Sequence, residues 1–136
     1  MVLVPEQISF NVTDEAIQSY ARLTCDFNPL HVDPEFAARS TMNGVIAHGT
    51  MISNLLWLVL EANYGPAHAT SFCLSVRYLA PARPGMHLIA GGAQTQAEPV
   101  TFDLWVRDES GRTLITGTAT GRTLNSSAIQ PDKGRP

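Results

Sequence analysis

The feature that most constrains the fold is an apolar segment near the middle of the chain, which predicts a helix from about Gly49 to Asn63. The pair Gly65-Pro66 follows this segment and is typical of a helix end. Apolar residues occupy nearly every side of the helix, at Met51, Ile52, Leu55, Leu56, Trp57, Leu58, Val59 and Leu60. A helix that is apolar all round must be enclosed by other elements. The rest of the chain therefore has to supply a cover.

That cover is predicted to be β-sheet, because the second half of the chain alternates apolar and polar residues. The alternation is cleanest over residues 71–80, and weaker strands are expected at 86–97, 100–107 and 112–124. The Gly91-Gly92 pair predicts a bulge or a sharp bend. Turns are expected at Glu98-Pro99 and at residues 108–111, and a short strand at residues 8–12. Long antiparallel strands joined by short turns indicate a meander.

These elements predict one α+β domain with the hot-dog fold, a bent antiparallel β-sheet wrapped around one long apolar central helix. A chain of 136 residues suits a single domain, which we expect to span residues 1–124, with a disordered tail at 125–136. Only 15% of the residues are charged, against about 25% in an average globular protein. Because such a sheet also exposes an edge strand that a second copy could pair with, we expect a homodimer.

Charge and hydropathy exclude several kinds of partner. The formal net charge is −3 and there is no run of Lys or Arg, which argues against nucleic acid and anionic membranes. The longest apolar run is far shorter than the roughly 20 residues of a membrane span, and the N-terminus does not resemble a signal peptide. We therefore expect a cytoplasmic protein with a small-molecule ligand. Cys25 and Cys73 are expected to be reduced and packed as small hydrophobic residues.

A cluster of polar residues lies between the first helix, expected from the Thr13 cap to about Cys25, and the central helix. Asp26, Asn28 and His31 fall within six residues, and His48-Gly49 comes just before the apolar run. A carboxylate and an imidazole are the residue types of general acid–base catalysis, and the start of a helix offers free N–H groups. The alternative is that Asp26 and Asn28 cap a helix end and a turn, and that His48 is buried and satisfied.

The motifs in this region resemble a known family. Asp-x-Asn-Pro-x-His begins at Asp26, Asp-Pro-x-x-Ala follows at Asp33, and Ile-Ala-His-Gly precedes the central helix. Residues 20–56 thus resemble the MaoC-like (R)-specific enoyl-CoA hydratases and dehydratases, and the later segment VRYLAPARPG is compatible with that family.

The resemblance implies that Asp26 and His31 are a catalytic pair acting on a trans-2-enoyl thioester of CoA or an acyl carrier protein. They would add one water reversibly, giving the (R)-3-hydroxyacyl thioester. The resemblance assigns the N–H of Gly49 to the thioester carbonyl, with Asn28 and His48 as supporting polar groups. It implies no cofactor beyond the CoA or phosphopantetheine of the substrate. We expect no metal, because no His and carboxylate have a trustworthy ligand spacing.

The chain departs from the family at Trp57, where many relatives carry a Ser nine residues after the His of the His-Gly pair. Trp57 is therefore expected to shape the acyl pocket and to alter specificity. Two other functions stay open. The first is a hot-dog acyl thioesterase, although the chain lacks the Asp-x-x-Gly-His-type motif of that branch. The second is an acyl-binding subunit of a heteromeric dehydratase, which the presence of both Asp26 and His31 disfavours.

Overall fold

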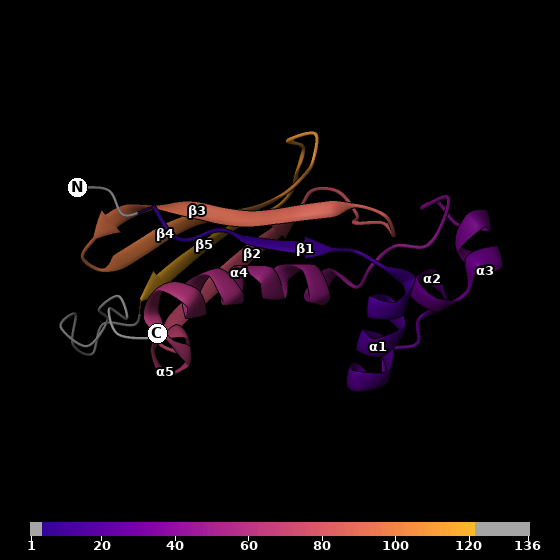
Figure 1. Ribbon diagram of the computed structural model, residues 1–136, viewed down its shortest axis with the longest axis horizontal. Helices are drawn as coiled ribbons and strands as arrows, with labels where there is room; N and C mark the ends of the chain where they lie inside the picture. Colours follow the sequence, from indigo (N-terminus) through magenta and orange to yellow (C-terminus); the bar gives the residue numbers. More distant parts are fainter. Residues whose placement is uncertain (1–3, 122–136) are drawn as a thin grey trace.

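A computed structural model describes residues 4–121 of the protein, which form one antiparallel sheet with helices on one side and at one end (Figure 1). The five strands are β1 (Ile8–Asn11), β2 (Phe72–Tyr78), β3 (His87–Ala97), β4 (Val100–Asp108) and β5 (Thr113–Gly121). The last expected strand was drawn to residue 124, so its end, like the tail expected at 125–136, lies outside the described residues.

The order of the strands across the sheet is β1-β3-β4-β5-β2. The predicted meander is therefore right for β3, β4 and β5 but wrong for β2. Strand β2 precedes β3 in the chain, yet it pairs with β5, with Phe72 opposite Gly121 and Tyr78 opposite Ile115. The connection that follows β2 passes the N-terminal end of the central helix, where the N–H of Ala47 donates to the carbonyl of Ala82.

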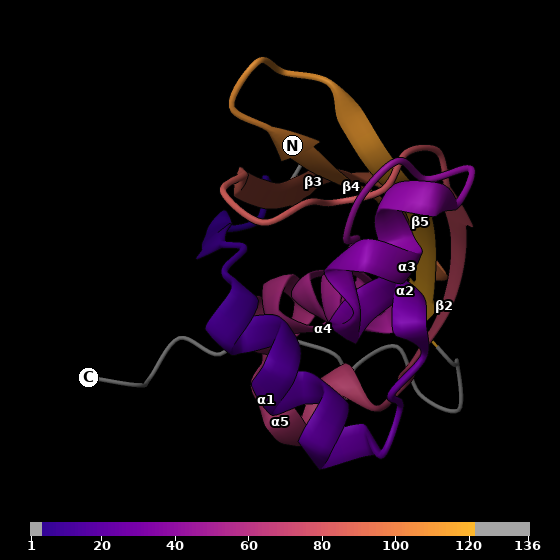
Figure 2. The ribbon, with the colours of Figure 1, turned by 90° about the vertical axis from the view of Figure 1, so that its right-hand side faces the viewer.

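The central helix is α4 (Gly49–Tyr64), and it packs against the inner face of the sheet. Figure 2 shows the sheet bending around it, with β3 and β4 on one side and β5 and β2 on the next. Leu56 and Val59 are fully buried in the core. The helix approaches β5 closely at Gly117, where a Cβ atom would lie 2.9 Å from Cδ1 of Leu56. The predicted α+β architecture, a bent sheet around one apolar helix, is confirmed.

One side of α4 is not covered by the other elements of residues 4–121, although its composition predicted complete enclosure. Leu58 is 43% exposed on that side. No helix among residues 4–121 is both long and apolar enough to span a lipid bilayer.

The pair Gly91-Gly92 carries no bulge, which was one of the two features predicted for it. The pairing with β4 is continuous there, and the register shifts between Gln94 and Gln96 instead. The two glycines allow close packing between the strands. A Cβ atom on Gly92 would lie 2.2 Å from the carbonyl oxygen of Asp103, and one on Gly91 would lie 2.9 Å from the Trp105 ring.

Four shorter helices complete the fold: α1 (Asp14–Thr24), α2 (Pro29–Val32), α3 (Pro34–Arg39) and α5 (Pro66–Ala69). The Thr13 hydroxyl caps α1, as predicted, and accepts from the N–H of Ala16. The Asp33 carboxylate caps α3 and accepts from the N–H of Phe36. Helices α1, α2 and α3 gather at the end of the molecule where α4 begins (Figure 1). Cys25 and Cys73 are both exposed, so the expectation that they pack in the interior is wrong.

Candidate active site

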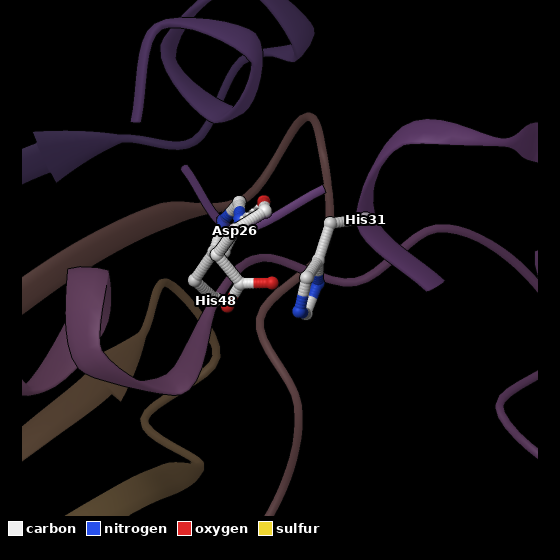
Figure 3. Close-up of side chains that lie close together, drawn as sticks. All are labelled: Asp26, His31 and His48. Atoms are coloured by element: carbon white, nitrogen blue, oxygen red, sulfur yellow. Dashed lines mark hydrogen bonds between the residues drawn. The ribbon is translucent and has the colours of Figure 1, made fainter. Parts of the chain in front are cut away.

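Three polar side chains from separate segments meet at the N-terminal end of α4. Asp26 follows the end of α1, His31 lies in α2, and His48 is the residue immediately before α4. One side-chain nitrogen or oxygen from each lies within 4.8 Å of the other two. Figure 3 shows the Asp26 carboxylate pointing toward the His31 ring. The structure thus brings together three of the residues that the sequence singled out.

Local hydrogen bonds fix the turn that carries Asp26. Oδ1 of Asp26 accepts the backbone N–H of Asn28 at 3.2 Å, and Oδ1 of Asn28 accepts the N–H of Leu30 at 3.0 Å. Asn28 therefore caps α2, with Pro29 at the first helical position, where its missing N–H costs nothing. Asn28 can therefore both cap α2 and support the site, because its cap fixes the backbone between Asp26 and His31. The carboxylate has no ion-pair partner within residues 4–121.

The tautomer of His31 follows from its backbone contact. Its Nδ1 lies 2.8 Å from the carbonyl oxygen of Ile46. A carbonyl can only accept a hydrogen bond, so Nδ1 carries the proton and donates. In the neutral ring Nε2 is then left with a free lone pair, and in the charged ring Nε2 carries the proton that can be given away. His31 is therefore oriented to exchange a proton at Nε2.

His48 is almost completely buried, with 2% of its surface exposed. Its Nε2 lies 3.0 Å from the backbone carbonyl oxygen of Asp26 and must donate to it, by the same argument as for His31. The His48 ring also stacks on the His31 ring, with centroids 4.0 Å apart and planes at 29°. His48 thus ties the start of α4 to both polar residues of the overlying segment.

Asp26, His31 and His48 offer three possible metal ligands that lie close together. Their spacing in the sequence did not predict a metal site, because Asp26 and His48 are 22 positions apart. A metal must lie near the plane of each imidazole, along the ring lone pair. The His31 and His48 rings are stacked with nearly parallel planes, so these directions do not converge on one point. The geometry fits proton transfer better than metal ligation, and the absence of a metal stays a prediction.

Gly49 begins α4 beside this cluster. The first N–H groups of a helix have no acceptor within the helix, and the His48 side chain does not cap them. Within residues 4–121 the N–H of Gly49 has no hydrogen-bond acceptor, and it lies at the positive end of the helix dipole. Gly49 also allows close approach of a neighbouring ring, because a Cβ atom there would lie 3.0 Å from Cε1 of Tyr78.

A cavity of about 310 Å³ opens next to these residues and is lined by His31, Gly49 and Tyr78 together with apolar side chains. The Tyr78 hydroxyl donates to Oγ of Ser53 at 3.2 Å. No motif in the sequence pointed to Tyr78 or Ser53 as site residues, and Tyr78 is 51% exposed at the end of β2. The hydroxyl of Tyr78, at the end of an otherwise apolar row, was the available signal. A larger hollow of about 520 Å³, which Arg77 and Trp105 help to line, includes none of the predicted site residues.

Trp57 does not line the cavity beside His31. It lines a separate hollow of about 500 Å³, together with Thr70, Phe72, Cys73 and Leu74 of the segment that leads into and forms edge strand β2. Trp57 lies more than two helical turns from Gly49 along α4. The structure therefore does not support the expectation that Trp57 shapes an acyl pocket next to the candidate catalytic residues.

Comparison with known proteins gives a consistent result. Residues 4–104 match the family model described as MaoC like domain. The chain is 32% identical over 65 residues to the mitochondrial 3-hydroxyacyl-(acyl-carrier-protein) dehydratase of Arabidopsis thaliana, covering 48% of this chain and 39% of that protein. It is 44% identical over 39 residues to the (R)-specific enoyl-CoA hydratase of Aeromonas caviae, covering 29% of each. The matches thus span well under two thirds of either relative.

Among solved structures, the (R)-hydratase from A. caviae involved in PHA biosynthesis superposes with a TM-score of 0.73 at 24% identity. The superposition covers 87% of this chain and 94% of that one. At this level of identity the likeness establishes the shared fold.

Proposed function

Because this chain belongs to the MaoC-like domain family, we propose that it is an enoyl-thioester hydratase or dehydratase. The reaction is the reversible addition of water to a trans-2-enoyl thioester, which gives the (R)-3-hydroxyacyl thioester. The acyl group is carried by CoA or by the phosphopantetheine of an acyl carrier protein, and the chain needs no other cofactor. The observation that carries the proposal is that side-chain polar atoms of Asp26, His31 and His48 lie within 4.8 Å of one another at the start of α4, next to an apolar cavity that His31 and Gly49 help to line.

In the proposed mechanism one water molecule sits between the Asp26 carboxylate and Nε2 of His31. As its oxygen bonds to C3, this pair takes up a proton from the water, and the π electrons of the C2=C3 bond move toward the thioester carbonyl. The N–H of Gly49 donates to the negative charge that develops on the carbonyl oxygen. The pair then delivers a proton to C2, so that the water supplies both the hydroxyl and the hydrogen. Dehydration runs the same steps in reverse.

We further propose that the working unit is a homodimer. Strand β2 is an edge strand with no second neighbour in the part of the chain that the structure describes. The hollow lined by Trp57 and Leu74 lies between this edge and α4, and Leu58 is exposed on the same helix. A second copy placed against this face would cover the exposed apolar surface of Leu58 and the hollow beside it.

The test is a direct assay with short trans-2-enoyl thioesters of both CoA and an acyl carrier protein. Hydration removes the conjugated enoyl group, so the ultraviolet absorbance of the substrate falls, and a chiral separation shows whether the product is the (R) isomer. A thiol reagent in a parallel reaction detects the free thiol that a thioesterase would release. Turnover without thiol release supports the proposal. Thiol release, or no turnover with any carrier and chain length, contradicts it.

A further inference from the structure

We propose that the hollow lined by Arg77 and Trp105 binds a small molecule that carries a phosphate group and sugar hydroxyl groups, such as a mononucleotide. Arg77 and Arg107 hold the phosphate, and Asp103 accepts hydrogen bonds from the hydroxyl groups; all four residues line this hollow. The inference goes beyond the proposed function and does not rest on it, because the hollow is separate from the candidate active site.

The hollow lies on the outer face of the sheet, which points away from α4. Along β4 the buried residues Leu104 and Val106 alternate with the exposed residues Asp103 and Arg107. Successive side chains of a strand point to opposite faces of a sheet. The volume of about 520 Å³ lies within the range of roughly 300–1,000 Å³ for ligand pockets. A ligand bound there leaves the cavity beside His31 open, because the two hollows share no lining residue.

The strand register gathers positive charge in one part of this hollow. Thr116 of β5 pairs with Arg77 of β2 on one side and with Trp105 of β4 on the other. These three residues form one row across the sheet, because paired residues point to the same face. The guanidinium carbon of Arg107 lies over the Trp105 ring, 3.9 Å from its centroid. The charge of Arg107 is thus brought to the row that begins at Arg77.

The two arginines can bind an anion without giving up another partner. Neither forms an ion pair within residues 4–121, and the contact with Trp105 orients Arg107 without neutralising its charge. A guanidinium presents a planar fork of N–H donors that matches two oxygens of a phosphate. Two such groups favour a doubly charged phosphate over a singly charged carboxylate. Threonine hydroxyls add further donors in the same hollow, at Thr113, Thr116 and Thr118.

Asp103 limits the chemistry of the rest of the ligand. It lies in the next row of the sheet, where Thr118 pairs with both Asp103 and Ser75. This row is about 7 Å further along β4 than Trp105, since Asp103 is two residues away. An ionised carboxylate repels a second anionic group and accepts hydrogen bonds from hydroxyl groups. A phosphate joined to a sugar meets the requirements of both rows.

Trp105 provides the measurement, because the protein contains two tryptophans. Trp57→Phe leaves Trp105 as the only tryptophan, so the fluorescence of this variant reports on the hollow. The variant is titrated with AMP, ribose 5-phosphate, inorganic phosphate and ribose at constant ionic strength. We expect AMP and ribose 5-phosphate to bind with a Kd of about 1 mM or lower, inorganic phosphate to bind several-fold more weakly, and ribose not to bind. Calorimetric titration of the wild type checks the same affinities without the substitution.

Substitutions in the Trp57→Phe protein assign the two ends of the ligand. Arg77→Gln and Arg107→Gln should each weaken the binding of ribose 5-phosphate about ten-fold or more, because each removes charge-assisted hydrogen bonds. Arg22→Gln is the matched control, because Arg22 is exposed on α1 and does not line the hollow. It should leave the affinity unchanged. Asp103→Asn should strengthen the binding of inorganic phosphate and reduce the advantage of ribose 5-phosphate over it.

Three results would overturn the inference. The first is no saturable change with any of the phosphate compounds up to about 10 mM. The second is an equal loss of affinity in Arg22→Gln, which would indicate a general effect of net charge. The third is binding of inorganic phosphate as tight as that of ribose 5-phosphate. Arg77 and Arg107 are exposed, so we expect their variants to fold, and circular dichroism checks this. The titrations measure binding alone, so their outcome is independent of whether the protein hydrates an enoyl thioester.

Discussion

His48 connects the two proposed catalytic residues while remaining out of solvent. Its Nε2–H holds the backbone carbonyl of Asp26, and its ring supports the face of His31. Its Nδ1 is buried and makes no hydrogen bond within residues 4–121. We infer that His48 acts as a positioning residue, because its contacts are with the backbone of Asp26 and the ring of His31.

Replacing His48 separates its role as a hydrogen-bond donor from its role in packing. His48→Leu removes the donor and leaves the Asp26 carbonyl without its partner, and we expect kcat to fall roughly ten-fold or more with a small change in KM. His48→Gln keeps an N–H donor on a side chain of similar length and should retain more of kcat than the leucine variant. Steady-state kinetics of the two variants check this. Equal kcat values in both would show that the hydrogen bond does not matter.

Cys25 lies directly before Asp26 and has a left-handed backbone conformation, with a φ of 56°. Only Gly adopts this conformation without a cost of about 1–2 kcal/mol. We expect Cys25→Gly to raise the free energy of unfolding by about 0.5–1 kcal/mol, because the gain is partly offset by the greater entropy of Gly in the unfolded chain. Denaturation with urea measures the change. Asn43→Gly is the matched control, since Asn43 has a φ of 55° but Asn tolerates this region better, so it should gain less.

The residues of the site differ in how far the sequence could identify them. Asp26, His31 and Gly49 could be singled out because two separated motifs carry them, and the structure places all three at the start of α4. Tyr78 and Ser53 could not, since their hydrogen bond joins a strand to a helix across 25 positions. Which side chains line a cavity depends on the path of the chain in space, and this is also why the sequence could not show which hollow Trp57 lines.

At the scale of elements, local signals predicted helices well and strand order poorly. Helices α1 and α3 have caps that are visible in the sequence, at Thr13 and Asp33. Helix α2 was missed, although Asn28 followed by Pro29 is a typical helix start, because the helix is only four residues long. The pairing of β2 with β5 joins segments about forty residues apart, and no local pattern encodes such a pairing.

Gly91 and Gly92 are neighbours in β3, and alanine at these two positions should differ in its effect on stability. A Cβ atom on Gly92 would collide with a backbone oxygen at 2.2 Å, whereas one on Gly91 would meet side-chain atoms of Trp105 and Gln7. Side chains can move aside more easily than the backbone of a paired strand. We therefore expect Gly92→Ala to lower the free energy of unfolding by about 1–3 kcal/mol or more, and Gly91→Ala to cost less. Urea denaturation of both variants tests this, and the reverse order would contradict the account of the strand contact.

At the scale of the whole molecule, the proposed homodimer rests on the exposed side of α4 and on the edge position of β2 among residues 4–121. Light scattering in solution should give twice the chain mass of 14.7 kDa. Leu58→Glu places a charge on this surface and should shift the mass toward that of the monomer. Leu23→Glu is the control, because Leu23 is 80% exposed on α1 and should leave the dimer intact. A monomeric wild type would contradict the proposed assembly.

The fold as a whole was predictable because one apolar helix requires a cover and the alternating segments can form only a sheet. The confirmed α+β architecture follows from these two patterns. The uncovered side of α4 was not predictable, since composition does not say whether the cover comes from the same chain or from another copy. The homodimer therefore stays a prediction. The cytoplasmic location also stays a prediction.

The central claim is that Asp26 exchanges a proton with a water molecule that adds to an enoyl thioester. The most direct measurement compares kcat/KM on a short trans-2-enoyl-CoA for the wild type, Asp26→Asn and Asp33→Asn. Asp26→Asn keeps the shape of the side chain but removes the base, and we expect a loss of about 10²–10⁴-fold. Asp33→Asn makes the same chemical change at the cap of α3, where Asn caps as well as Asp, and should stay within a few-fold of the wild type. Equal activity in all three proteins, or an equal loss in both variants, would contradict the claim.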